Sequence, residues 1–496
     1  MEEEAGSFDK SVEVTLSEVK QKAVKGVVAL TGRTLVLRMI AFASQGLLWA
    51  FLDLEHFGTF LLVSATVNFL SYFADIGLGA ALIQKKEKPI EADYKTVFTV
   101  QEILVVSVSL ILIFLSPSFA QSHSLSSEGL HLLYALTAAF FLASLKNIPS
   151  IILERKLEFS KFIIPQILED LVYNVVVVYF AWRGYGLTSF TYAVLARGLV
   201  GVVAIYILQP WRPGIALSKT SLKALLNFGI PYQLNNFLAT IKDDGLTIVM
   251  GGILGTAGLG ILGTAQKASQ YPLRFFMDTV TKVTFPAFSR MQDDREELSK
   301  TVNRSVFFIC ALVFPSLVGL VVLFPHLLEI IPKYKKWEPA YIPLIYFSAN
   351  AAIAAFTTQF TNTLNAVGKI KTTFKLMVMW TSLSWFFIPY LGKNYGTNGA
   401  ALGYFIVSAS SIIAYYIIRQ IIIVDAFYSI AKPFLAATVM GLSIYSVLNY
   451  VEKIDPLKFT GIVGFGAVTY GLALYAMVGR SLIDDVKKTI SGIFRK

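Results

Sequence analysis

Long apolar segments constrain the fold of this chain more than any other feature of its sequence. About fourteen of them follow one another, separated by short polar breaks. A helix of about 20 apolar residues is long enough to cross the hydrocarbon of a bilayer. The expected spans are 29–53, 57–83, 96–119, 129–153, 159–181, 187–208, 227–254, 258–288, 304–331, 339–364, 372–391, 397–418, 430–450 and 459–479. We therefore predict an all-α, polytopic membrane protein with about fourteen transmembrane helices.

Composition agrees with this prediction. Hydrophobic residues make up 55% of the 496 residues and charged residues only 15%, whereas a soluble domain has about a quarter charged residues. Cys310 is the single cysteine and lies in an apolar run, so neither a disulfide framework nor a cysteine metal cluster is expected. Residues 1–25 contain no apolar core and no small-residue cleavage site, so we do not expect them to form a signal peptide.

The basic residues predict the orientation in the membrane. Lys and Arg are about four times as frequent in one set of alternate loops as in the other, and basic loops stay on the cytoplasmic side. We expect a multi-pass protein of the cell membrane with both termini cytoplasmic. The net charge of +11 is explained by this topology, without a nucleic-acid partner. The loops are too short for a soluble catalytic domain.

A faint internal repeat predicts two lobes. An offset of 202 residues aligns 57–60 with 259–262 and 82–85 with 284–287. This spacing suits two pseudo-symmetric six-helix lobes related by an axis along the membrane normal, plus two C-terminal helices. The predicted organisation is a cytoplasmic segment 1–25, an N-lobe 26–210, a C-lobe 220–420, two further spans in 428–480 and a cytoplasmic tail 481–496.

Basic residues inside spans are the strongest candidates for function, since each costs about 2.5–3.5 kcal/mol on insertion scales unless it is paired or hydrated. Arg33 and Arg38 lie in the first span, and snorkelling to the interface is their alternative explanation. Lys242 is followed directly by Asp243 and Asp244 in the middle of the seventh span, where an intrahelical structural pair is the alternative to a role in an aqueous cavity. The eighth span contains Lys267 and Arg274; Arg274 can pair with Asp278, four residues later.

Acidic residues inside spans fall into two groups. Glu169 and Asp170 in the fifth span can meet Arg197 of the sixth span at mid-depth, and we interpret these three as a structural ion pair between adjacent helices. Asp75 and Glu102 are candidate carriers of a coupling proton or cation, as are Asp243 and Asp244. Satisfaction by Ser, Asn or water is the alternative for Asp75 and Glu102.

Catalytic motifs give little support to an enzyme. The chain has no phosphate-binding GxxxxGK[ST] motif and no HExxH motif, and no metal site is predicted. Asp53-Leu54-Glu55 precedes the second span, where membrane glycosyltransferases that use lipid-linked sugars carry an acidic metal-binding motif. Those enzymes also need a long outer loop, and here the loop has about four residues.

Several motifs carry a resemblance to a known family. They are His56-Phe-Gly-Thr-Phe60, the stretch Phe73-Ala-Asp-Ile-Gly-Leu-Gly-Ala-Ala-Leu-Ile-Gln-Lys85, Asn227-Phe-Gly-Ile-Pro231, Leu254-Gly-Thr-Ala-Gly-Leu-Gly260, Tyr271-Pro272 and Phe285-Pro-Ala-Phe-Ser-Arg-Met-Gln-Asp-Asp294. In this order they resemble the polysaccharide (Wzx-type) flippases of the multidrug/oligosaccharidyl-lipid/polysaccharide exporter superfamily, and within it the colanic-acid and teichuronic-acid exporter branch. The resemblance runs from about residue 26 to residue 419.

The resemblance implies fourteen spans in two lobes and alternating-access flipping of a polyprenyl-diphosphate-linked oligosaccharide for surface polysaccharides such as O-antigen or exopolysaccharide. Related peptidoglycan-precursor flippases use basic residues in regions comparable to Arg33, Arg38, Lys242, Lys267 and Arg274, which are therefore the predicted substrate-binding residues. Asp75, Asp243 and Asp244 are the predicted coupling residues, with H+ or Na+ as the coupling ion and no cofactor.

Membrane lipids and a glycan polymerase or other assembly proteins are the expected partners of such a flippase. Three alternatives remain open from the sequence. They are a small-molecule or drug cation antiporter of the same superfamily, the membrane glycosyltransferase above, and a non-transporting scaffold of a glycan assembly complex.

Overall fold

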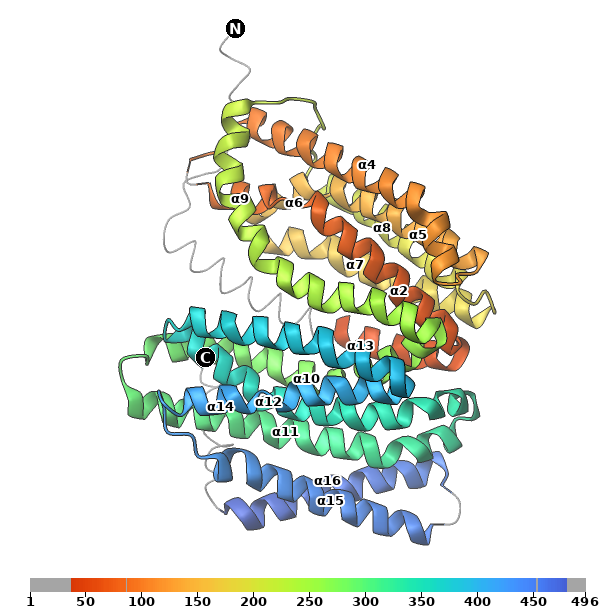
Figure 1. The fold of residues 1–496 in the computed structure, drawn as a ribbon, viewed down its shortest axis with the longest axis vertical. Coiled ribbons are helices and arrows are strands. Elements are labelled where there is room, and N and C mark those ends of the chain that lie inside the picture. The colour runs from red at the N-terminus through yellow and green to blue at the C-terminus, as the bar shows by residue number, and fades with distance from the viewer. Residues whose placement is uncertain (1–36, 86, 452–453, 480–496) are drawn as a thin grey trace. The chain divides into compact units, whose positions relative to one another are not determined.

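The computed structural model describes residues 37–85, 87–451 and 454–479, which form helices joined by short turns (Figure 1). No strand occurs within these ranges. Among the same residues, eleven helices are long and apolar enough to cross a membrane, and a shorter apolar helix covers Leu37–Phe51. The prediction of an all-α, polytopic membrane protein is confirmed.

The chain divides into two compact units, Met1–Gly260 (unit 1) and Ile261–Lys496 (unit 2). Unit 1 contains α2 (Leu54–Ser71), a 3₁₀ turn η2 (Tyr72–Ala74), α3 (Leu78–Gln84), α4 (Glu91–Ser122), α5 (Ser127–Leu145), α6 (Asn147–Arg155), α7 (Phe159–Trp182), α8 (Thr188–Leu208), α9 (Lys219–Thr240), a π turn η3 (Ile241–Gly245) and the first part of α10 (Leu246–Arg290). Unit 2 contains the rest of α10, α11 (Arg295–Ile330), η4 (Pro332–Ala340), α12 (Tyr341–Ala366), α13 (Ile370–Ala409), α14 (Ile412–Ile418), η5 (Phe427–Ala431), α15 (Lys432–Tyr450) and α16 (Pro456–Val478). The first unit thus includes α9, which the sequence assigns to the C-lobe.

Two of the long helices are hairpins that turn on a single glycine. Gly396 in α13 has φ 63° and ψ −147°, which is not a helical conformation, and a left-handed φ favours glycine. A Cβ built on Gly403 would lie 2.9 Å from Ile388 Cα. In a straight helix these residues would be about 22 Å apart, so the chain must fold back between them.

Gly255 plays the same part in α10, with φ 68° and ψ 177°. A Cβ on Gly251 would lie 3.2 Å from the Leu259 side chain, eight residues further on. Both turns lie where the sequence predicts a boundary between two spans, at 254–258 and 391–397. The total of fourteen spans stays a prediction, because the first predicted span begins outside the described residues.

Two other predicted spans are interrupted. The span expected at 57–83 consists of α2, η2 and α3, with an extended break at Asp75. The span expected at 129–153 consists of α5 and α6, which meet at Lys146. These breaks matter because each places a charged residue at a helix end inside an apolar stretch.

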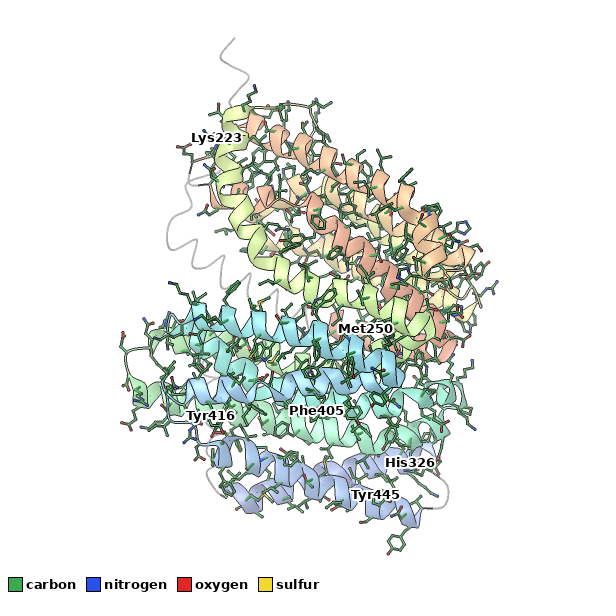
Figure 2. All side chains as sticks on the ribbon, viewed as in Figure 1. Lys223, Met250, His326, Phe405, Tyr416 and Tyr445 are labelled. Atoms are coloured by element: carbon green, nitrogen blue, oxygen red, sulfur yellow. The ribbon has the colours of Figure 1, made fainter. Side chains whose placement is uncertain are left out.

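In unit 1, α7 packs along α8, α8 along α5, and α5 along α4 (Figure 1). The short helix α3 is held by an apolar cluster in which Leu78 and Leu82 join Val97 of α4, Ile151 of α6 and the buried Trp211. The helix α9 continues through η3 into α10. Figure 2 labels Lys223 and Met250, and the ribbon bends between these two residues.

In unit 2, α11 packs against α12 and α15, and α15 against α16. A polar network lies inside its apolar core. Gln359 of α12 is 0% exposed; its amide nitrogen donates to Thr281 Oγ1 at 3.2 Å, and its oxygen accepts from Thr284 at 3.3 Å and Ser305 at 3.4 Å. Interhelical hydrogen bonds of this kind help to hold membrane helices together. Gln359 therefore joins α10, α11 and α12.

In each unit, a linker is held by hydrogen bonds between its backbone and side chains at the start of a long helix. In unit 1, Thr96 and Thr99 at the start of α4 accept hydrogen bonds, both 3.1 Å, from the backbone N–H groups of Ser218 and Ala216.

In unit 2, Ser299 at the start of α11 accepts from the backbone of Ile423 at 3.1 Å, and Asn303 from that of Asp425 at 2.9 Å. The Asn303 amide also donates to the Ile423 carbonyl at 2.7 Å. In both units, polar side chains at the start of a long helix thus bind the backbone of a distant linker.

Candidate functional site

The charged turn η3 lies between the consecutive helices α9 and α10. Its five residues form one π turn, a feature found frequently at functional sites, and it contains the predicted Lys242, Asp243 and Asp244. Lys242 Nζ lies 3.4 Å from Asp243 Oδ1, while the Asp243 side chain is 71% exposed. Asp244 instead accepts a hydrogen bond from the Asn68 side chain of α2. The three predicted residues therefore form one group, in which the second carboxylate turns to a neighbouring helix.

The other predicted basic residues lie elsewhere. Arg38 is near the beginning of the helix Leu37–Phe51, and Arg33 lies outside the described residues. Lys267 and Arg274 are on the part of α10 that belongs to unit 2, where Lys267 is partly exposed and Arg274 exposed. Within unit 1 the structure thus groups Lys242 with two carboxylates, and it places Lys267 and Arg274 on unit 2.

Two predicted acids have local partners. Asp75 is exposed and accepts a hydrogen bond from the backbone of Gly77 at 2.9 Å; Gly77 has φ 75° and begins α3. Asp75 therefore forms the turn between η2 and α3. Glu102 of α4 accepts from the Ser144 hydroxyl at 3.0 Å, and its other oxygen is buried without a hydrogen-bond partner among the described residues.

The acidic motif Asp53-Leu54-Glu55 lies at the start of α2. Asp53 is the N-cap of this helix, and its backbone N–H donates to His56 Nδ1 at 3.2 Å in a capping box. Such an arrangement satisfies backbone donors at a helix start. Capping thus accounts for the position of Asp53, and no group of three or more potential metal ligands occurs among the described residues.

A four-residue charged cluster in unit 1 joins α7, α8 and the junction between α5 and α6. Arg197 Nη2 lies 3.2 Å from Asp170 Oδ1, and Arg197 Nε lies 3.7 Å from Glu169 Oε2. The sequence places these three residues together as an ion pair. It does not include Lys146, whose ammonium group lies 2.7 Å from Glu169 Oε1. Lys146 is the one residue between α5 and α6. A cation inside the fourth predicted span, 129–153, is the signal that could have revealed it.

This charged cluster borders a cavity of about 250 Å³. The cavity extends from the cluster along α7 toward the turn between α6 and α7. Its walls include Ser150 of α6 and Gln166 of α7, with Phe162, Pro165 and Ile205 as apolar neighbours. A space of this size holds about eight waters at their liquid volume of about 30 Å³ each.

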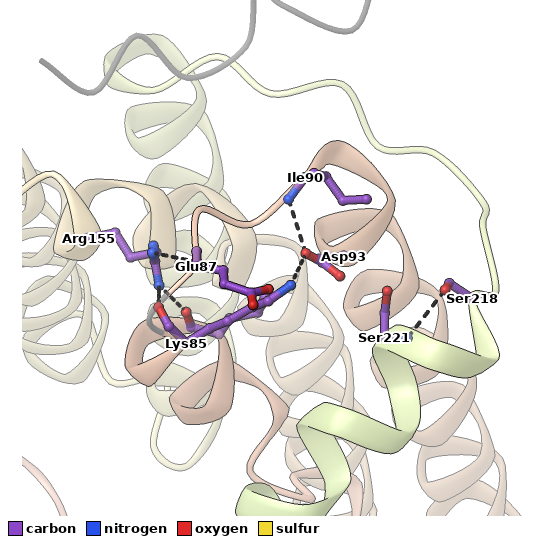
Figure 3. Close-up of polar contacts among 8 residues, drawn as sticks. Lys85, Glu87, Ile90, Asp93, Arg155, Ser218 and Ser221 are labelled. Atoms are coloured by element: carbon purple, nitrogen blue, oxygen red, sulfur yellow. Dashed lines mark hydrogen bonds and ion pairs between the residues drawn. The ribbon is translucent and has the colours of Figure 1, made fainter.

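A second polar cluster holds one end of α3 (Figure 3). The Arg155 guanidinium donates to the backbone carbonyls of Leu82, Ile83 and Lys85, the last two at 3.1 Å. Lys85 in turn pairs with Asp93 at 2.7 Å, and Asp93 is 1% exposed. A cation beside the final carbonyls of a helix is favourable. The sequence shows Arg155 only as one of many basic loop residues, so its role in holding α3 could not be predicted.

Comparison with known proteins identifies the family. A family model described as "Polysaccharide biosynthesis protein" matches residues 47–341. The chain belongs to this family. The predicted resemblance to polysaccharide exporters is thereby confirmed, and the protein is a multi-pass membrane protein.

Two known proteins and a solved structure resemble the chain over most of its length. It is 21% identical to the lipopolysaccharide biosynthesis protein WzxC of Escherichia coli, over 80% of this chain and 81% of WzxC. It is 23% identical to the probable flippase AglR of Haloferax volcanii, over 85% of this chain and 89% of AglR. The structure of the lipid II flippase MurJ in an inward closed conformation has a TM-score of 0.74 and 16% identity, covering 92% of this chain and all of MurJ. The likeness to MurJ shows a shared fold.

Proposed function

We propose that the protein is a flippase that moves a polyprenyl-diphosphate-linked oligosaccharide across the cell membrane by alternating access, without covalent chemistry, for surface polysaccharide biosynthesis. The observation that carries the proposal is the family membership, together with near full-length similarity to a relative named as a probable flippase. The proposed orientation in the membrane has both termini in the cytoplasm, as the distribution of basic residues among the loops predicts. A glycan polymerase or other assembly proteins would then be partners in the same membrane.

Elementary energetics explain why such a substrate needs a protein. A diphosphate and its sugar hydroxyls lose their hydration in hydrocarbon, which costs several kcal/mol for each unsatisfied group. Lys and Arg side chains in a hydrated cleft replace the lost water around the phosphates, while the polyprenyl tail stays in lipid. Arg33, Arg38, Lys242, Lys267 and Arg274 are the proposed contacts with the head group.

Coupling to a H+ or Na+ gradient, or to the membrane potential, is the proposed source of direction. The η3 turn supports Asp243 and Asp244 in this role, because it holds two carboxylates and one cation, Lys242, which contacts Asp243. Binding of a proton or Na+ would change the charge that the turn presents to an anionic substrate. Asp75 is the weaker candidate, since its carboxylate already forms the turn before α3.

The test is surface-glycan export in cells that lack the native protein, complemented with Arg38→Ala and Lys242→Ala variants. We expect each variant to reduce export at equal membrane abundance. Lys300→Ala is the matched control, because Lys300 forms a solvent-exposed pair with Glu296 within one helix and such pairs contribute little. Unchanged export in both test variants would remove these residues from the site.

Two further measurements separate the alternatives to a flippase. Efflux of cationic drugs without glycan export would favour the antiporter. Sugar transfer by the purified protein would favour the glycosyltransferase.

A further inference from the structure

We infer that the cavity beside Arg197 in unit 1 is a binding site for a phosphate or diphosphate oxyanion, distinct from the η3 turn. The inference concerns binding alone, so it can fail while the proposed transport function stands. The cavity is about 250 Å³, large enough for a diphosphate group and several waters. The kind of ligand that the cavity would bind follows from which hydrogen-bonding groups around it already have partners.

Each carboxylate of the charged cluster already has a cation beside it. Glu169 Oε1 accepts a hydrogen bond from the Lys146 ammonium group at 2.7 Å. The other carboxylate oxygen, Oε2, lies 3.7 Å from Arg197 Nε. Asp170 faces Arg197 at 3.2 Å. Two carboxylates are thus balanced by two cations, so these four side chains carry no net negative charge that would attract an added cation.

Both cations of the charged cluster have hydrogen-bond donors to spare. A guanidinium has five N–H donors, and the carboxylate contacts of Arg197 use only its Nε and Nη2 edges. Its side chain is 47% exposed. Lys146 has three ammonium hydrogens and one carboxylate partner. The unused hydrogen-bonding capacity of both cations is therefore donor capacity alone.

Two neutral donors on the cavity wall complete the site. Ser150 and Gln166 line the cavity, and neither side chain has a hydrogen bond to the residues that the structure describes. An oxyanion accepts from hydroxyl, amide, ammonium and guanidinium groups together, and such charge-assisted hydrogen bonds are the strong ones. The apolar side chains of Phe162 and Ile205 limit solvent on the remaining sides.

The experiment measures binding of potassium pyrophosphate to the full-length protein in detergent, by calorimetry. Gln166→Leu is the cleanest variant, because Gln166 supports no other residue of the described structure and its loss should leave folding intact. We expect this variant to weaken pyrophosphate binding about tenfold, the loss of one hydrogen bond to a charged group. Arg197→Lys keeps the charge but loses the planar donor fork, and we expect an effect at least as large.

The matched controls are the same two substitutions made at positions that do not line the cavity. Gln121→Leu changes an exposed glutamine at the end of α4, and Arg183→Lys an exposed arginine after α7. Both should bind as the wild type does. Absence of pyrophosphate binding by the wild type at millimolar concentrations would overturn the inference, as would equal weakening in test and control variants.

Two further binding measurements identify the ligand of the cavity. Farnesyl diphosphate that competes with pyrophosphate and binds more tightly would assign the site to an isoprenyl-linked diphosphate, whereas equal affinity would assign it to a free diphosphate. Titration with sodium chloride against potassium chloride tests the rival occupant. Sodium-specific binding that disappears in Asp170→Asn, with no pyrophosphate binding, would make the cavity a cation site and end the proposal.

Discussion

Gly58 of α2 and Gly260 of α10 lie backbone to backbone, and neither position has room for a side chain. A Cβ on Gly58 would collide with the Thr256 carbonyl oxygen and lie 2.8 Å from the Gly260 nitrogen, while a Cβ on Gly260 would collide with the Leu54 carbonyl oxygen. These are also the two glycines that the 202-residue offset aligns. Small residues allow membrane helices to approach this closely.

Gly58→Ala should therefore destabilise the protein by forcing α2 and α10 apart. Added volume in a packed contact costs about 1–3 kcal/mol, and we expect a lower melting temperature of the detergent-solubilised protein. Gly464→Ala is the control, because a Cβ on Gly464 meets nothing within 4 Å. Equal melting temperatures for Gly58→Ala and the wild type would contradict the close contact.

Gln359→Leu should lower the stability of unit 2. The substitution removes three side-chain hydrogen bonds that reach α10 and α11, each worth about 0.6 kcal/mol on average between membrane helices. A loss of about 1–2 kcal/mol is expected, measured by denaturation in mixed micelles. Asn394→Leu serves as the control, since among the described residues the Asn394 amide bonds only to the Tyr390 carbonyl of its own helix.

Asn303→Ala should release the linker between α14 and α15. Asn303 contacts the backbone of both Ile423 and Asp425, so its loss lowers the free energy of local opening. Trypsin should then cut after Arg419 several times faster than in the wild type, as followed by mass spectrometry of the fragments. Asn394→Ala should leave this rate unchanged, and a similar rate in Asn303→Ala would show that the linker is held by other contacts.

Arg155→Gln should loosen the end of α3. Its guanidinium binds carbonyls at the end of that helix, and hydrogen bonds to a charged group contribute about 1.5–3 kcal/mol each. Amide hydrogen exchange in residues 78–90 should become about tenfold faster. Lys156→Gln, at the next position after the end of α6, is the control. Equal exchange rates in the two variants would mean that the apolar cluster alone holds α3.

The sequence predicts the helical class, the hairpin boundaries near Gly255 and Gly396 and the meeting of Glu169 and Asp170 with Arg197, because each depends on local hydropathy or on depth in the bilayer. It does not predict the breaks at Asp75 and Lys146. Both lie inside apolar stretches, where hydropathy alone cannot distinguish one helix from two.

Side-chain to backbone contacts are also hidden from the sequence. Arg155, Thr96 and Asn303 act on carbonyls or N–H groups far along the chain, and any residue can supply those partners. Gln166 is hidden for a different reason. Its role in the proposed oxyanion site rests on the fact that its side chain bonds to no residue in the described part of the chain. Only the packing of α6, α7 and α8 shows this.

The glycine-turned hairpins bear on how the chain enters the bilayer. In α10 and α13 the two arms are joined by a single non-helical residue. The turn therefore contains almost no polar backbone that would have to cross the bilayer between the two arms. Each pair of arms should partition from the translocon as one unit. Epitope or glycosylation tags for topology mapping would break these turns, and belong instead in the longer segment between α10 and α11.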